Sequence, residues 1–241
     1  MQRASFRQLG WLALWVSCAS PLCAQEPGTP VQTAEVTARF TTTQKSNTPQ
    51  GDKVRSAVIW LNPLRAGVAP PVTPGTFTMM QKNKMFMPRL LVVPVGSSVA
   101  FPNADPFFHN VFSLFDGRRF DLGLYEAGST RSVVFSREGV SYIFCNIHSD
   151  MSAVIIALAT PYYGLADQQG VFHLKDVPHG DYDLHVWIEG QGQSSLDQLT
   201  RRVHVTGGVT DLGAIRSSRP DQQQHLNKFG QPYEPDAHPI Y

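Results

Sequence analysis

The chain has 241 residues, 42% of them hydrophobic, which is enough for one large domain or two small ones. Its formal net charge of +1 provides no basic surface for nucleic acid or anionic lipid, so we expect no nucleic-acid partner. The 18 prolines and 19 glycines, spread between short apolar runs, favour strands and turns over long helices.

The N-terminus has the layout of a secretory signal peptide. Arg3 and Arg7 precede the short apolar stretch "LGWLALWVSCAS", and "PLCAQ" offers a cleavage position after Ala24. A membrane anchor is the alternative, but the apolar stretch is too short to span a bilayer comfortably. We therefore predict a signal peptide over residues 1–24, a periplasmic or secreted protein, and no integral membrane segment once the signal is removed.

Cleavage after Ala24 would remove Cys18 and Cys23 and leave Cys145 as a lone cysteine. Exported proteins normally pair their cysteines, because an unpaired thiol is open to oxidation. Cys145 is therefore either buried and inert or occupied by a bound group such as a metal.

Short strands are predicted along most of the chain. "AEVTARF" and "RSAVIWLNP" indicate two strands, and the proline-rich "LRAGVAPPVTPGT" after them indicates a linker. From residue 76 onward, evenly spaced β-rich segments such as "RLLVVPV", "HNVFSLF", "VSYIFC" and "MSAVIIAL" are typical of a β-sandwich. We expect an all-β protein.

A second β-unit follows in "GVFHLKDVPHGDYDLHVWIEG" and "TRRVHVTGGVTDLGAI". Apolar side chains alternate with polar ones here, so one face is expected to be buried. The inward set is Phe172, Leu174, Tyr182, Leu184, Val186, Val203 and Val205. Residues 216–241 have no period and few aliphatic side chains, which predicts a disordered or loosely docked tail.

The stretch "CNIHSDM" places Cys145, His148 and Met151 within one short loop between two predicted strands. Thiolate and imidazole ligands select copper, zinc or iron, and a thioether is of little use to zinc. One Cys, two His and a long axial Met make the blue-copper electron-transfer site. The second histidine must come from elsewhere, and His109, in "FPNADPFFHNVFS", is the best candidate.

The segment from about residue 77 to 158 resembles the cupredoxins. The matching features are the hairpin "FMPRLLVVPVGSSVAFPN", the "HN" corner and the C-x2-H-x2-M loop, whose short spacing is closest to that of amicyanin. The whole pattern resembles the plastocyanin/amicyanin-like proteins called methylamine utilization proteins. These commonly carry a Trp before the Met, where this chain has Asp150, so their partners cannot be transferred to this chain.

The resemblance implies a Greek-key β-sandwich that binds one type-1 copper. Cys145 would supply the thiolate, His109 and His148 would complete a trigonal plane, and Met151 would be the axial ligand. Asn110 would correspond to the cupredoxin asparagine that ties the two ligand loops together. The alternative is a buried cysteine with two incidental histidines in a copper-free sandwich.

"YYGLADQQGVFHLKDVPHGDYDLHVW" resembles the carboxypeptidase regulatory-like, or transthyretin-like, sandwich. That module normally opens with strands like the two near the N-terminus. The resemblance therefore implies a split sandwich of residues 33–62 and 161–215, with the copper domain, residues 74–160, inserted between them. The alternative is that the first strands simply extend the copper sandwich.

Three histidines, His173, His185 and His204, fall on the outward face of this second unit. They are candidates for a second metal site. Scattered histidines on a solvated strand face are the more ordinary interpretation.

We expect an exported one-electron carrier that serves an unidentified redox partner protein. A cupredoxin site has no open coordination position, so we expect no enzyme activity. His148 is expected near the surface, within an apolar docking patch of Phe107, Phe108 and Ile147. The alternatives are a copper chaperone or store, and an interaction scaffold with a vestigial copper site.

Overall fold

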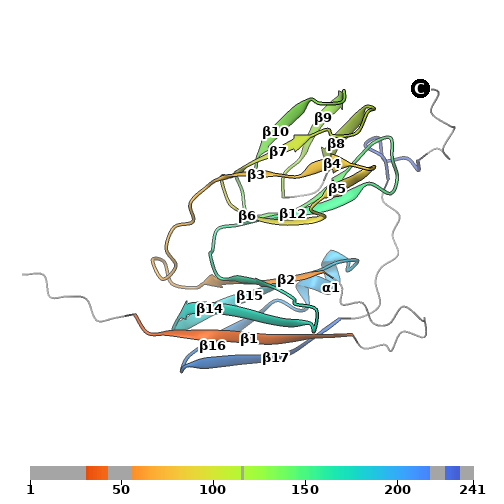
Figure 1. Cartoon of the computed structure of the whole chain (residues 1–241). Coiled ribbons are helices and arrows are strands. Elements are labelled where there is room, and N and C mark those ends of the chain that lie inside the picture. Colours follow the sequence, from red (N-terminus) through yellow and green to blue (C-terminus); the bar gives the residue numbers. More distant parts are fainter. Residues whose placement is uncertain (1–30, 43–55, 115–116, 218–225, 234–241) are drawn as a thin grey trace, which may run out of the picture. The chain divides into compact units, whose positions relative to one another are not determined.

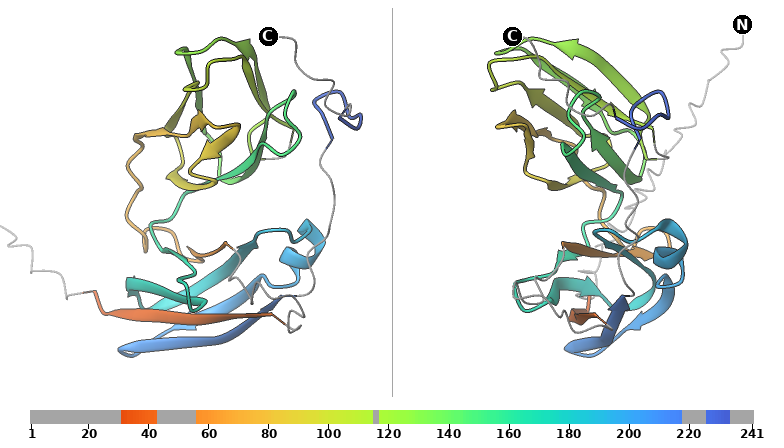
Figure 2. Two further views of the ribbon diagram at one scale, coloured as in Figure 1. Left: turned by 45° about the vertical axis from the view of Figure 1, so that its right-hand side comes forward. Right: turned by 90° about the vertical axis from the view of Figure 1, so that its right-hand side faces the viewer.

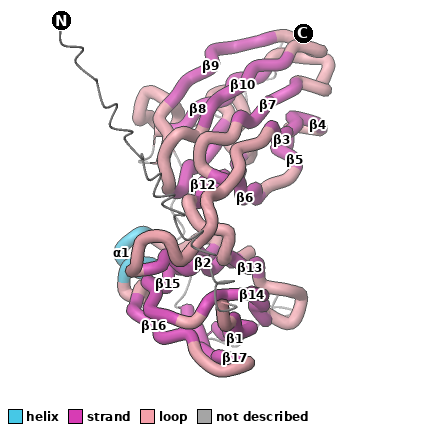
Figure 3. The backbone as a smooth tube through the Cα atoms, turned by 90° about the vertical axis from the view of Figure 1, so that its left-hand side faces the viewer, coloured by secondary structure: helices cyan, strands magenta, loops and turns pink. Residues whose placement is uncertain are grey.

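The computed structural model describes residues 31–42, 56–114, 117–217 and 226–233. The predicted signal peptide, residues 1–24, lies outside the described residues. The regular secondary structure of the described residues is almost all strand, and its one helix is the short α1 (Gln193–Asp197). Figure 3 shows the strands and the loops that join them. No helix in these ranges is both long enough and apolar enough to cross a membrane.

We call the strands from residue 76 to 158 the central group. Its members are β3 (Thr76–Thr78), β4 (Met80–Lys82), β5 (Met85–Met87), β6 (Leu90–Pro94), β7 (Ser98–Pro102), β8 (His109–Ser113), β9 (Phe120–Tyr125), β10 (Thr130–Val134), β11 (Gly139–Phe144) and β12 (Ser152–Leu158). They form a five-stranded sheet in the order β6-β12-β11-β8-β9, a three-stranded sheet β10-β7-β3 and the hairpin β4-β5 (Figure 1).

We call the strands on either side of it in the sequence the outer group. They are β1 (Thr33–Thr42), β2 (Ala57–Pro63), β13 (Tyr163–Leu165), β14 (Val171–Pro178), β15 (Gly180–Ile188), β16 (Arg201–Val205) and β17 (Val209–Ser217). Their sheets have the orders β14-β1-β17 and β13-β2-β15-β16. β1 and β2 thus pair with strands that follow the central group, and with none inside it.

The predicted alternation in the outer group matches the observed burial. Phe172, Leu174, Tyr182, Leu184 and Val205 are at most 1% exposed, whereas the intervening polar side chains reach solvent. Together with side chains from β1 and β2 they form a continuous apolar core.

Strand β12 is buried on both faces. Val154, Ile156 and Leu158 belong to the same core as the outer group's side chains. Ala153, Ile155 and Ala157 belong to a second core inside the central group, which also contains Cys145 and Met151. Burial on both faces explains why this strand is continuously apolar and does not alternate.

Of the predicted tail, residues 216–241, the structure describes residues 216–217 and 226–233, and the rest lies outside the described residues. Residues expected to begin the tail form the end of β17, which runs to Ser217. Residues 226–233, which we call the C-terminal segment, are drawn in blue near the C-terminus in Figure 2. They make hydrogen bonds with Asp121 of β9 and with residues 145 and 146. These contacts are polar and irregular, so they leave no apolar period in the sequence.

Candidate metal centre

The structure brings His109, Cys145 and His148 together. The Sγ atom of Cys145 lies 3.8 Å from Nδ1 of His109 and 3.6 Å from Nδ1 of His148. The three ligand atoms lie within 4.8 Å of one another, and no other such group of His, Cys, Asp or Glu occurs among the described residues. One sulfur and two imidazole nitrogens therefore converge on a single point.

The pairing of β8 with β11 explains this convergence. These strands are antiparallel neighbours with Phe112 opposite Phe144. The start of β8, where His109 lies, is consequently beside the residues that follow β11, where Cys145 begins the loop to β12.

We call residues 145–151 the ligand loop. It is closed by two backbone hydrogen bonds, from Cys145 N–H to the Met151 carbonyl at 3.2 Å and from Met151 N–H to the His148 carbonyl at 3.1 Å. Met151 is fully buried in the same core as Cys145. The fourth predicted ligand is thus held at the closing end of the loop.

The sulfur of Cys145 is buried but is surrounded by donors. Burial raises the pKa of the Cys145 thiol, and backbone N–H groups of Asn110, Ile147 and His148 act in the opposite direction. Such donors stabilise negative charge on sulfur, which is the form that binds a metal. The site therefore suits a soft cation that replaces the thiol proton.

Asp105 is a site residue that the sequence reasoning missed. Its Oδ2 lies 2.8 Å from Nε2 of His109, and it also accepts the backbone N–H groups of Asn83 at 2.6 Å and Lys84 at 2.9 Å. A carboxylate can only accept here, so Nε2 carries the hydrogen and Nδ1 is left as the ligand atom facing Cys145. An acid four residues before the histidine, in "DPFFH", was the available clue.

Burial and hydrogen bonding oppose each other in this pair. Burial raises the pKa of Asp105, but the hydrogen bonds from Lys84, His109 and Asn83 outweigh it and leave the pKa below its usual value. Burial lowers the pKa of His109, and Asp105 opposes that shift in part. His109 is therefore neutral around pH 7, as a metal-binding imidazole must be.

Asn110 connects to Cys145 in a way the resemblance did not imply. Its side chain donates to Asp121 Oδ1 at 2.7 Å, on the neighbouring strand β9. The link toward the ligand loop is made by its backbone N–H, which points at the Cys145 sulfur.

One of the three predicted docking residues, Phe107, packs against both candidate histidine ligands. The ring centroid of Phe107 lies 5.2 Å from that of His109 and 5.7 Å from that of His148. Phe108 is 46% exposed, and Ile147 and His148 are half-buried. Phe107 is therefore in contact with both candidate ligand histidines, one of which, His148, is half-buried.

The three outward histidines of the outer group do not converge. His173 bonds Glu35 and His204 bonds Asp181, each at 2.8 Å, and His185 stacks on Trp60 with ring centroids 5.3 Å apart. His173 also belongs to a different sheet from the other two. They form no metal-binding group in the described part of the chain.

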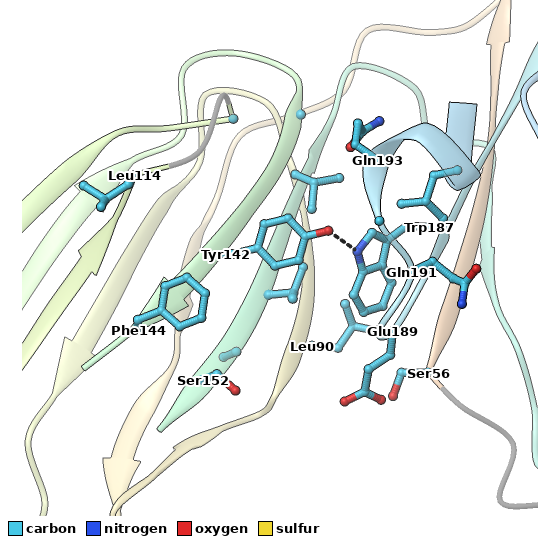
Figure 4. Close-up of a pocket in the computed structure, with 18 of the residues that line it drawn as sticks. Ser56, Leu90, Leu114, Tyr142, Phe144, Ser152, Trp187, Glu189, Gln191 and Gln193 are labelled. Atoms are coloured by element: carbon cyan, nitrogen blue, oxygen red, sulfur yellow. Dashed lines mark hydrogen bonds between the residues drawn. The ribbon is translucent and has the colours of Figure 1, made fainter. Parts of the chain in front are cut away.

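A separate hollow lies beside α1 and strands β11 and β15 (Figure 4). Aromatic side chains line it, and Trp187 Nε1 donates to the hydroxyl of Tyr142 at 3.3 Å across it. None of the four predicted ligands lines this hollow. The candidate metal centre is therefore a distinct feature.

No protein-family model and no curated protein matches the chain. Among solved structures, a purple cupredoxin from Nitrosopumilus maritimus is 24% identical, with a TM-score of 0.31, over 34% of this chain and 98% of that one. A reduced amicyanin mutant is 18% identical, with a TM-score of 0.32, over 41% of this chain and 99% of that one. A copper-containing nitrite reductase from Thermus scotoductus is 20% identical, with a TM-score of 0.34, over 49% of this chain but 28% of that one.

Proposed function

We propose that this chain is an exported cupredoxin that binds one type-1 copper and carries single electrons. The observation that carries the proposal is the convergence of His109 Nδ1, Cys145 Sγ and His148 Nδ1 within 4.8 Å. This is the donor set of the blue-copper site, and the buried Met151 beside it is suited to the weak axial position.

The surroundings support electron transfer rather than catalysis. Two imidazoles, a thiolate and a thioether leave no coordination position for a substrate, so we propose that the chain is not an enzyme. A carrier also needs ligands that barely move between Cu(I) and Cu(II). The hydrogen bonds within the ligand loop and from His109 to Asp105 supply that rigidity.

The partner would be a redox protein that docks at the apolar surface of Phe107, Phe108 and Ile147. A small patch of this kind favours weak and short-lived association. Replacing Phe108 with Lys should slow electron transfer to the partner and leave the copper spectrum unchanged. Val209→Lys, an exposed apolar position in the outer group, is the matched control and should change neither.

The strand pairing supports a split domain organisation. We propose that residues 33–62 and 161–215 form a transthyretin-like sandwich, and that residues 74–160 are a cupredoxin domain inserted into it. The pairing of β1 with β14 and β17, and of β2 with β13 and β15, supports this organisation over an extended copper sandwich.

The deciding experiment is the visible spectrum of the mature protein loaded with Cu(II). We expect intense colour from thiolate-to-copper charge transfer, one copper per chain, and complete loss of the colour in Cys145→Ser. A colourless protein that binds zinc as readily as copper would contradict the proposal.

Copper retention separates the carrier from a chaperone or store. The wild type should cycle reversibly between Cu(II) and Cu(I) while a modest Cu(I) chelator removes no metal. Release of copper on reduction, or transfer of copper to an apo-acceptor faster than electrons, would favour the chaperone. A protein that cannot cycle at all would favour an interaction scaffold.

A further inference from the structure

The C-terminal segment contacts the ligand loop at two adjacent residues. The hydroxyl of Tyr233 donates to the backbone carbonyl of Cys145 at 2.8 Å. The backbone N–H of Lys228 donates to Oδ1 of Asn146 at 3.0 Å. The segment thus holds the first two residues of the loop, one of which supplies the metal-binding sulfur.

A third contact ties the same segment to the strand beside His109. Lys228 Nζ lies 2.8 Å from Oδ2 of Asp121 on β9. The other oxygen of Asp121 accepts the side-chain amide of Asn110, the residue next to His109. Through Asp121, the segment therefore reaches the second ligand-bearing strand as well as the loop.

The segment is itself held in a defined turn. Asn227 accepts the N–H groups of Phe229 at 2.9 Å and Gln231 at 3.0 Å with its side-chain oxygen, and that of Gly230 at 2.9 Å with its carbonyl. Lys228 lies within this turn, and Tyr233 lies two residues after it.

The backbone carbonyl of Cys145, which accepts the Tyr233 bond, belongs to a fully buried residue. The Cys145 side chain is 0% exposed, and its N–H is already used in the bond to Met151. Without the Tyr233 hydroxyl, the Cys145 carbonyl would lose this hydrogen bond. A water molecule could replace the donor only by entering beside the proposed metal ligands.

We propose that residues 226–233 are a clamp for the ligand loop, in which Tyr233 and Lys228 are positioning residues that restrain opening of the Cys145–Asn146 peptide. The inference extends the proposed function, since the restrained residue is the predicted copper ligand. It also makes the site depend on residues that follow the last strand of the outer group.

The test measures the reactivity of Cys145 in the metal-free, full-length mature protein. The buried thiol must be exposed by opening of the loop before it reacts with an aromatic disulfide reagent. Tyr233→Phe removes only the hydroxyl and should raise the labelling rate roughly threefold to tenfold, the factor that one neutral hydrogen bond is worth. Lys228→Met should raise it in the same direction.

Tyr163→Phe is the matched control, because it also removes a phenolic hydroxyl, from a 39% exposed tyrosine on β13 that lies outside the C-terminal segment and the ligand loop. It should label at the wild-type rate. The urea midpoint of Tyr233→Phe should also remain that of the wild type, because the clamp acts on local opening. If Tyr233→Phe labelled faster but its urea midpoint fell enough to explain the faster labelling by global unfolding, the proposal would be overturned.

Labelling of Tyr233→Phe at the wild-type rate would overturn the clamp, whether or not the wild type binds copper. If the wild type bound no copper but Tyr233→Phe still labelled faster, the proposed function would fail and the clamp would stand. With copper bound, Tyr233→Phe should lose metal to a chelator faster than Tyr163→Phe does, and equal rates of loss would count against the clamp.

Discussion

Asp105 and His109 form a buried pair in which a carboxylate oxygen lies 2.8 Å from the imidazole nitrogen that faces away from Cys145. The carboxylate fixes the tautomer, orients the ring and makes the opposite nitrogen a stronger donor. Asp105 would therefore act on the proposed metal ligand His109 without itself contacting the metal.

Asp105→Asn should lower the affinity for Cu(II) by about 10- to 100-fold, the usual cost of removing such a partner of a ligand histidine. The measurement is competition for Cu(II) against a chelator of known affinity. Asp150→Asn removes an exposed carboxylate from the ligand loop and should leave the affinity unchanged. Equal affinities for the wild type and Asp105→Asn would show that the pair has no such role.

Met151→Leu should preserve the fold and alter the copper site. The swap conserves volume, so it should cost less than about 1.5 kcal/mol in the free energy of unfolding. Leucine has no sulfur donor, so the visible spectrum and the reduction potential of the loaded protein should change. Met79→Leu makes the same swap in the same core, also at 0% exposure, and should leave both unchanged.

Ile155 and Ile156 allow the two cores to be tested separately, since they are adjacent on β12 and both 0% exposed. Either change to Ala should cost about 2–5 kcal/mol in urea unfolding. Only Ile155→Ala should also shift the copper spectrum, because Ile155 shares its core with Cys145 and Met151. Val134→Ala, at a position 48% exposed, should cost less than about 0.5 kcal/mol. A spectral shift in Ile156→Ala alone would contradict the assignment of faces.

The bond between Lys228 and Asp121 should weaken in acid. Burial raises the pKa of Asp121, but hydrogen bonds from Lys228, Asn110 and Gly123 outweigh it and leave the pKa below its usual value. A lowered folded-state pKa means that the stabilisation is complete above the unfolded-state pKa and is lost as pH falls through the folded-state pKa. The Lys228 amide should therefore be better protected from hydrogen exchange in the wild type than in Asp121→Asn at pH 7. The difference should disappear below the folded-state pKa, and a difference that persisted there would contradict this account.

The grouping of Cys145 and His148 could be predicted because both lie on one short loop, where spacing alone limits their separation. His109 was harder, and it could be identified because the "HN" corner resembles that of cupredoxins. Its approach to the loop depends on the pairing of β8 with β11, which the strand pattern does not specify. Asp105 was missed because its contact with His109 depends on how the intervening loop folds.

The C-terminal segment could not be predicted for a different reason. Hydrophobic periodicity reports apolar burial, and this segment is held by an amide, an ammonium group and a phenol. Its composition predicts a disordered or loosely docked tail, and the acceptors that it contacts, such as Asn146 and Cys145, lie more than 80 residues earlier in the chain.

The burial of β12 on both faces has a consequence for how this chain can diverge. Strand β12, which follows Met151, contributes alternate side chains to the outer group's core and to the core of the central group. Its sequence must therefore suit both cores. A relative without the outer group would have polar side chains at the positions of Val154, Ile156 and Leu158. Substituting its copper-binding segment into this chain would therefore remove three apolar side chains from the outer group's core. Residues on both faces of β12 are therefore expected to co-vary, and the candidate metal centre depends in part on a core that contains none of its predicted ligands.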